Sequence, residues 1–196
     1  MALTTLFVEI LIIGTISEIW LFLILLSFIS FDPNTTTFII DSIYKLSAFL
    51  IIPYLSITYS LGWLVNFISE RIFKLFFQKK FRDKIFSDAG YDYYNARGLL
   101  FQKASSDVMQ DFRFDRHILR ISRSSVVNFS LITIFLLLNY DKMSTSILLL
   151  CVLISTSFVI VSFYQWKAKY KSNYSKMLGI YKVVKDIKPE LIITLK

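Results

Sequence analysis

The sequence is poor in the residues that build disulfide scaffolds, catalytic sites and loop-rich soluble domains. Its 196 residues include 1 cysteine, 1 histidine, 3 prolines and 5 glycines. A single cysteine excludes a disulfide framework. Charged residues make up only 18% of the chain, whereas an ordinary soluble domain has about a quarter. Because 55% of the residues are hydrophobic, intrinsic disorder is excluded as well.

Apolar residues gather in long runs at positions 3–29, 46–68, 126–138 and 147–164. A helix needs about 20 apolar residues to cross the hydrocarbon core of a bilayer, and a core this small has no room for all of these runs. The third run is short, so residues 118–125 have to supply part of its crossing, with Arg120 and Arg123 reaching the membrane surface. We expect Pro53 to kink the second helix. The sequence therefore predicts an all-α integral membrane protein, a four-helix bundle.

Lysine and arginine are distributed unequally among the segments that connect these runs. Twelve of them lie within 70–123 and eight within 167–196, which leaves only Lys45 and Lys142 for the other connections. Basic residues collect in the cytoplasmic segments of membrane proteins. We therefore expect both basic segments, and with them both termini of the chain, to lie in the cytoplasm.

This interpretation divides the chain into spans one and two (1–69), a basic helical hairpin (70–124), spans three and four (125–164) and a C-terminal helix with its tail (165–196). The hairpin is predicted to turn at Ser87-Asp88-Ala89-Gly90. A second helix is then expected to run from Asp92 into the third span. The segment from Phe73 to Phe86 is either a stalk that continues the second span or an amphipathic helix on the bilayer surface.

Two patterns in the cytoplasmic segments predict binding surfaces. Basic residues expected to face anionic lipid headgroups or a partner protein are Arg113, Arg116, Arg120 and Arg123. Residues near heptad spacing on the C-terminal helix, here called the aromatic seam, are Trp166, Tyr170, Tyr174, Met177, Tyr181 and Val184. The general preference for basic residues at a cytoplasmic face is the first explanation for these arginines. The seam packs on the hairpin of its own subunit, on a second copy or on a soluble partner. The apolar strip 190–196 either adds a strand to a partner or docks back.

The first apolar run contains two acidic residues, Glu9 and Glu18. A carboxylate inside a bilayer costs several kcal/mol and is rarely carried without a use. Glu9 is expected near the headgroups and Glu18 deeper. Gly14 shares the face of Glu18, so a neighbouring backbone can approach it and bring a donor to the carboxylate. The expected donors are Ser56, Thr58, Ser60, Asn128, Ser130, Ser155 and Ser162.

Three interpretations of Glu18 remain open. It is a hydrogen-bonded acid within the bundle, a ring of carboxylates around an oligomer axis, or a switch whose protonation alters packing. In the fourth run, Cys151, Ser155 and Ser162 share one face. Their small size predicts close helix packing there.

The sequence lacks the motifs of an enzyme. His117 is the only imidazole, and no zinc, phosphate-loop or serine-nucleophile motif occurs. We therefore predict no catalysis, no cofactor and no metal. The hairpin carries twelve basic and seven acidic residues, so direct contact with nucleic acid is not expected either.

Two functions are compatible with these features. The first is a non-enzymatic, homo-oligomeric membrane platform or sensor subunit that recruits a soluble cytoplasmic protein. The second is a small homo-oligomeric ion channel or pore-forming effector that conducts past Glu18. The first accounts for more of the chain, because the cytoplasmic segments are longer than a minimal pore requires.

The predicted architecture resembles a known kind of membrane protein. Its features are four spans, cytoplasmic termini, a long basic hairpin between spans two and three, and a bias toward Phe, Ile, Lys, Asn and Tyr. In these it is similar to membrane subunits of bacterial anti-phage defence systems, the Kiwa membrane subunit among them. That resemblance implies an oligomer in the bacterial inner membrane that senses phage-induced disturbance and holds a cytoplasmic effector.

Overall fold

A computed structural model describes residues 2–28, 33–103 and 106–187. Within these ranges the chain is helical and contains no strand. The described part has 4 helices that are long and apolar enough to cross a membrane. The all-helical class predicted from the sequence is therefore confirmed, and these 4 helices have the length and composition that a membrane span requires.

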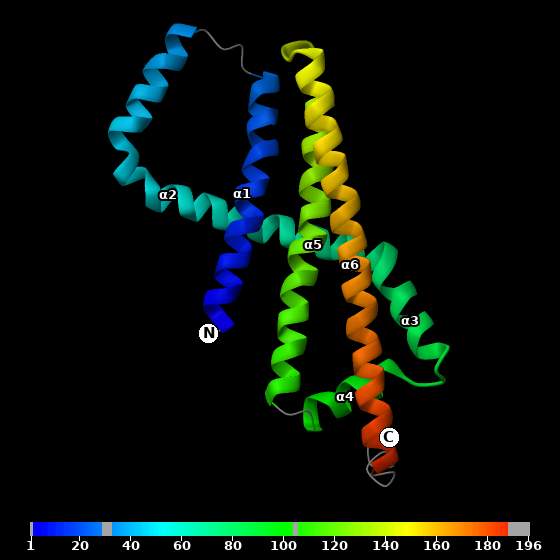
Figure 1. Cartoon of the computed structure of the whole chain (residues 1–196). Coiled ribbons are helices and arrows are strands. Elements are labelled where there is room, and N and C mark those ends of the chain that lie inside the picture. The colour runs from blue at the N-terminus through cyan, green and yellow to red at the C-terminus, as the bar shows by residue number, and fades with distance from the viewer. Residues whose placement is uncertain (1, 29–32, 104–105, 188–196) are drawn as a thin grey trace. The chain divides into compact units, whose positions relative to one another are not determined.

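The chain separates into two compact units. Unit 1 comprises Met1–Ser69 and Ile121–Phe163, and unit 2 comprises Glu70–Arg120 and Tyr164–Lys196. The elements in chain order are α1 (Ala2–Phe28), α2 (Pro33–Phe73), η1 (Lys74–Gln78), α3 (Lys79–Ser87), α4 (Tyr93–Lys103), α5 (Ser106–Leu138), η2 (Tyr140–Lys142) and α6 (Thr145–Ile187) (Figure 1). Helices α2, α5 and α6 each contribute residues to both units.

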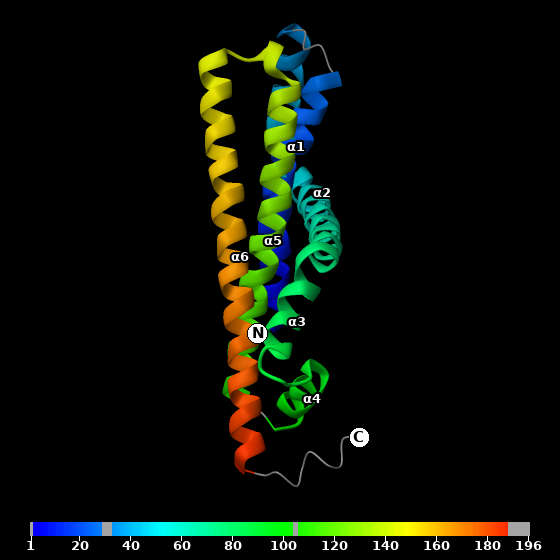
Figure 2. The same cartoon turned by 90° about the vertical axis from the view of Figure 1, so that its right-hand side faces the viewer.

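Unit 1 is built from α1 and the apolar parts of α2, α5 and α6. Helices α5 and α6 run side by side there, joined by the short 3-10 turn η2 (Figures 1 and 2). Phe129 of α5 stacks on Phe158 of α6 with ring centroids 4.7 Å apart. Leu23 of α1 completes a buried cluster with Ile132 and Leu136 of α5. This cluster is the apolar core of unit 1.

Helix α2 changes direction along its length (Figure 1). Pro53 lies inside this helix, and a proline removes a backbone hydrogen bond and clashes with the preceding turn. The predicted kink therefore has its physical cause within the helix. On the C-terminal side of Pro53, α2 crosses α1 where Gly62 meets Gly14.

Much of the apolar surface of unit 1 is exposed. Large exposed side chains on α2 and α6 are Ile51, Ile52, Leu55, Ile57, Leu64, Leu149, Leu150, Leu153, Ile160 and Val161. A water-soluble monomer rarely exposes a continuous apolar surface of this kind. Lipid tails or apolar faces of other helices are the surroundings that such side chains require.

The two helices α3 and α4 of unit 2 are joined by the turn that the sequence predicts. Tyr91 N–H donates to Phe86 O and Gly90 N–H donates to Ser87 O, both at 3.0 Å. Together these bonds form the Schellman motif that ends a helix. Gly90 has a φ of 69°, a value that glycine adopts at little cost. Asp92 then accepts a hydrogen bond from Asn95 N–H at 3.2 Å and caps α4.

The continuous second helix predicted from Asp92 into the third span is wrong. The structure has two helices, α4 ending at Lys103 and α5 beginning at Ser106. Leu99 and Leu100 of α4 share a buried cluster with Phe112 of α5, and a straight helix could not bring these positions together.

Candidate functional site

Glu18 of α1 is held by two hydroxyls of α2. Tyr54 Oη donates to Glu18 Oε2 at 2.7 Å, and Thr58 Oγ1 donates to Glu18 Oε1. Thr58 is among the donors expected from the sequence, whereas Tyr54 is not. Ser56 and Ser60 instead bond to carbonyl oxygens of their own helix. Both oxygens of this carboxylate are therefore engaged within the chain.

Helices α1 and α2 are in backbone contact where Gly14 meets Gly62. A Cβ atom built on Gly14 would lie 1.9 Å from Thr58 O, and one on Gly62 would lie 1.9 Å from Ile10 O. No side chain fits at either position. The close approach that the spacing of Gly14 and Glu18 predicts is therefore present, and it brings Thr58 to Glu18.

A buried asparagine joins α1 to α5. Asn128 Oδ1 accepts hydrogen bonds from Ser17 Oγ and Trp20 Nε1, both at 3.0 Å. Asn128 Nδ2 donates to Ile13 O at 3.0 Å. These bonds fix the register of the two helices, since a buried amide is stable only where its donors and acceptors are matched. Asn128 was expected as a donor to Glu18, and that expectation is wrong.

The second acid of α1, Glu9, is buried by the protein itself. Its exposed fraction is 3%, whereas Glu18 is half-buried. The depth expected for Glu9, near the headgroups, stays a prediction. Its position beside Ile10, whose carbonyl touches Gly62, explains the burial.

The predicted arginine stripe does not form one surface. Arg113 and Arg116 are exposed and Arg120 is half-buried, all within unit 2. Arg123 belongs to unit 1, is 8% exposed and donates from Nη2 to Asn66 Oδ1 at 3.0 Å. The headgroup-facing role predicted for Arg123 is therefore wrong, because Asn66 of α2 supplies an acceptor inside the protein.

Two of the three small residues on the predicted packing face of α6, Ser155 and Ser162, are buried as their spacing predicts. Ser155 is buried, and its Oγ lies 2.8 Å from Thr133 Oγ1 of α5. Ser162 is buried as well. Cys151 lies against an apolar cavity with Leu23, Ile132 and Leu136.

The aromatic seam of α6 is covered by unit 2 itself. Trp166 has no exposed surface, and Tyr170, Met177 and Tyr181 are buried too. Trp166 contacts the rings of Phe73, Phe77 and Phe81, and Tyr174 contacts Phe86 and Tyr93. The seam therefore packs on the hairpin of its own subunit, and its assignment as a partner-binding surface is wrong. The side chain of Val184 and the strip 190–196 lie outside the described part.

A buried carboxylate of α5 forms ion pairs with two lysines of α6. Asp115 of α5 is buried, and its oxygens lie 3.2 Å from Lys169 Nζ and 3.2 Å from Lys176 Nζ. Lys176 also lies 4.0 Å from the exposed Asp111. The pairing of Asp115 with these lysines could not be predicted from the sequence, because the partners lie 54 and 61 positions apart in the chain.

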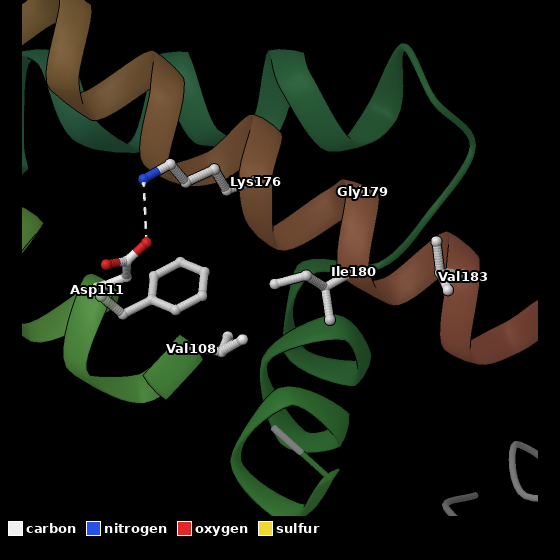
Figure 3. A pocket seen from close by; sticks show the side chains of 7 residues that line it. Val108, Asp111, Lys176, Gly179, Ile180 and Val183 are labelled. Carbon is white, nitrogen blue, oxygen red and sulfur yellow. Dashed lines mark ion pairs between the residues drawn. The ribbon is translucent and has the colours of Figure 1, made fainter. Parts of the chain in front are cut away.

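A groove in unit 2 is lined by one side each of α5 and α6. Its volume is about 410 Å³, and its lining consists of Val108, Asp111, Phe112, Lys176, Gly179, Ile180 and Val183 (Figure 3). Nothing lies within 4 Å of a Cβ built on Gly179. The apolar side chains form the wall, and the Asp111–Lys176 pair lies at one end (Figure 3). This groove could not be predicted from the sequence, because its walls come from segments of α5 and α6 that lie far apart in the chain.

The described residues contain no group of three or more His, Cys, Asp or Glu side chains that could hold a metal ion. No family model, curated protein or solved structure matches the chain. The structure itself therefore defines the class: an all-helical protein whose described part has 4 helices long and apolar enough to cross a membrane.

Proposed function

We propose that this protein is a non-enzymatic membrane platform that recruits a soluble protein through the groove of unit 2. The excess of lysine and arginine within 70–123 and 167–196 supports a cytoplasmic location for that unit and for both termini. The resemblance to membrane subunits of anti-phage systems supports the bacterial inner membrane and antiviral defence as the setting.

The groove is the observation that carries this proposal. Phe112, Ile180 and Val183 offer apolar surface, while Asp111 and Lys176 provide charges of both signs at its end. Gly179 leaves the wall open, although a glycine inside a helix costs about 1 kcal/mol relative to alanine. Apolar pockets with a few polar groups at the rim are typical of binding sites.

The partner best suited to this groove is an amphipathic helix. Two neighbouring helices form the walls, and a third helix laid between them would bury its apolar stripe. A basic and an acidic residue beside that stripe would pair with Asp111 and Lys176.

A variant that fills the groove tests the proposal. Gly179→Leu adds a side chain where there is open space and raises helix propensity, so the fold is preserved. Partner binding should weaken about tenfold or more, the effect of losing one strong contact. The protein is purified in mild detergent from its native host, and native mass spectrometry measures the stoichiometric partner.

Ser172→Leu is the matched control, because Ser172 is exposed on the same helix and lies outside the groove lining. The proposal requires that Gly179→Leu loses the partner and that Ser172→Leu retains it. Equal partner recovery from both variants would refute the groove as the docking site.

We also propose that the platform is a homo-oligomer within the membrane. The exposed apolar side chains of α2 and α6 in unit 1 support this proposal, since they provide surface for helix packing. The mass of the complex in the same measurement gives the number of copies. A single copy in every mild detergent would contradict it.

The channel alternative has less support. A carboxylate that lines a conduit needs oxygens free to meet ions, whereas both oxygens of Glu18 accept hydrogen bonds from Tyr54 and Thr58. Currents through planar bilayers that change in the Glu18→Gln variant would restore this alternative.

A further inference from the structure

A single π-helical turn, η1, interrupts the helix that leaves unit 1 through α2. It spans 5 residues, Lys74–Gln78, and α3 follows it without a break. A π-turn holds more residues than an α-turn and is often found at functional sites. In an α-helix, residues four apart drift by about 40°. The wider turn reduces this drift, so Phe73, Phe77 and Phe81 all meet the same ring, that of Trp166.

The opposite side of the same turn is apolar and exposed. Leu75 is 78% exposed and Phe76 is 69% exposed, which makes them the least covered large apolar residues among those described in unit 2. The register that packs Phe77 and Phe81 inward therefore turns Leu75 and Phe76 outward. Contact with water alone is an unfavourable environment for such a pair.

Exposed basic residues flank this apolar pair on both sides along the helix. Arg71 lies four residues before Leu75, and Lys79 and Lys80 lie four residues after Leu75 and Phe76. Residues four apart share a helix face. No acidic residue occurs between Arg71 and Arg82. The surface therefore combines two large apolar side chains with positive charge only.

The position of this surface along the chain relates it to the bilayer. Leu75 lies six residues after Ser69, the last α2 residue of unit 1, which is about 9 Å along a helix. The apolar run of the second span ends at Ile68. The apolar pair thus comes where a helix that crosses the membrane reaches the headgroups.

We infer that Arg71, Leu75, Phe76, Lys79 and Lys80 form a lipid anchor that binds anionic phospholipid headgroups. The phenylalanine and leucine enter the acyl boundary, and the basic side chains bind phosphate on both sides of them. This assignment rests on the proposed cytoplasmic location of unit 2. An anionic bilayer surface suits the anchor better than a soluble protein does, because the anchor continues a span directly and carries one sign of charge.

The anchor also combines the two structures predicted for the segment from Phe73 to Phe86. One face of the segment packs on α6, as a stalk would, through the contacts of Trp166. The other face carries the aromatic and basic residues of an interfacial helix. Both properties follow from the register set by η1.

A depth measurement tests the apolar half of the anchor. The full chain carries Cys151→Ser and one new cysteine, at Phe76→Cys or at the control Tyr94→Cys, which is also an exposed aromatic position of unit 2. Each cysteine is labelled with an environment-sensitive fluorophore in nanodiscs of phosphatidylcholine and phosphatidylglycerol. Quenchers attached to the lipid acyl chains should quench the label at position 76 and leave the label at position 94 unaffected. A label at 76 that only aqueous quenchers reach would overturn the inference.

A charge measurement tests the basic half. Lys79→Gln combined with Lys80→Gln removes two anchor charges, and Lys171→Gln combined with Lys182→Gln removes two exposed charges elsewhere in unit 2. Each lysine near an anionic surface contributes about fivefold in affinity. The variant with Lys79→Gln and Lys80→Gln should therefore retain roughly tenfold less phosphatidylglycerol, or less still, in native mass spectrometry than the variant with Lys171→Gln and Lys182→Gln. Equal retention would overturn the inference.

These measurements separate the anchor from the proposed function. They use purified protein and lipid without a partner, whereas the groove variants report partner binding. Loss of the partner in Gly179→Leu, together with a water-exposed label at position 76, would reject the anchor and keep the platform. A label at position 76 that the lipid quenchers reach, together with unchanged partner recovery in Gly179→Leu, would keep the anchor and reject the platform.

Discussion

Trp166 of α6 and Phe73 at the end of α2 meet edge to face, with ring centroids 4.6 Å apart. Trp166 also stacks on Tyr170 at 5.1 Å, and neither Trp166 nor Phe73 has more than 1% of its surface exposed. Edge-to-face and offset-stacked rings contribute energy beyond the area they bury. This pair is therefore the centre of the aromatic packing that holds unit 2 together.

Replacing Trp166 with alanine should destabilise unit 2 by about 3–5 kcal/mol, the usual cost of deleting a large buried aromatic side chain. Hydrogen exchange of the amides in α3 and α4 measures this loss as reduced protection. Tyr164→Ala is the control, because Tyr164 is exposed on the same helix. Equal protection in the two variants would show that Trp166 does not stabilise these helices.

Gly14→Ala and Gly62→Ala should each separate α1 from α2, because the added Cβ would lie 1.9 Å from a backbone oxygen of the other helix. Thermal unfolding in detergent should show a lower midpoint for both. Gly98→Ala and Gly179→Ala are controls, since nothing lies within 4 Å of a Cβ at either position. These controls should be neutral or more stable by up to about 1 kcal/mol. Equal thermal midpoints in all four variants would contradict the backbone contact between α1 and α2 at Gly14 and Gly62.

Asp115→Asn should destabilise unit 2 by about 2 kcal/mol, because it removes the charge that Lys169 and Lys176 share. Asp111→Asn should cost less than about 0.5 kcal/mol, since Asp111 is exposed and lies 4.0 Å from Lys176. Chemical denaturation followed by tryptophan fluorescence compares the two. A larger effect at Asp111 would contradict the assignment of Asp115 as the main acceptor.

Glu18→Gln should leave the fold nearly unchanged, whereas Glu18→Leu should destabilise unit 1 by about 1 kcal/mol. The glutamine oxygen accepts from Tyr54, and its amide donates to Thr58 Oγ1, which in turn donates to Tyr54 O at 2.9 Å. A leucine side chain has neither an acceptor for Tyr54 nor a donor for Thr58. The thermal midpoint in detergent measures both variants. A glutamine variant as unstable as the leucine variant would indicate that the negative charge itself is required.

The sequence predicts the helices of this protein well because their signals are local. Apolar runs mark the candidate spans, and Gly90 marks the turn between α3 and α4 through a backbone conformation that few other residues adopt. The shared face of Gly14 and Glu18 also follows from helical spacing on α1. In each case the residues that decide the structure are close together in the chain or share one face of one helix.

Other contacts could not be predicted because they depend on partners far away in the chain. Arg123 looks like a surface arginine until Asn66, 57 positions earlier, is placed beside it. The spacing of the aromatic seam predicts that another surface covers Trp166, but it does not identify that surface. Its cover depends on η1, and a single π-turn has no reliable sequence signal.

The π-turn accommodates about one residue more than an α-turn. Removing one residue such as Leu75 from Lys74–Gln78 would therefore leave an ordinary helix in which α3 keeps nearly the same rotational phase. Phe73 and Phe77 would then be three positions apart and Phe77 and Phe81 four, spacings that keep all three rings on the helix face that meets Trp166. One residue removed between Lys79 and Phe81 would instead rotate Phe81 by about 100° and turn it away from Trp166. This segment thus accepts a change of length at the π-turn but not in the α-helix that follows it.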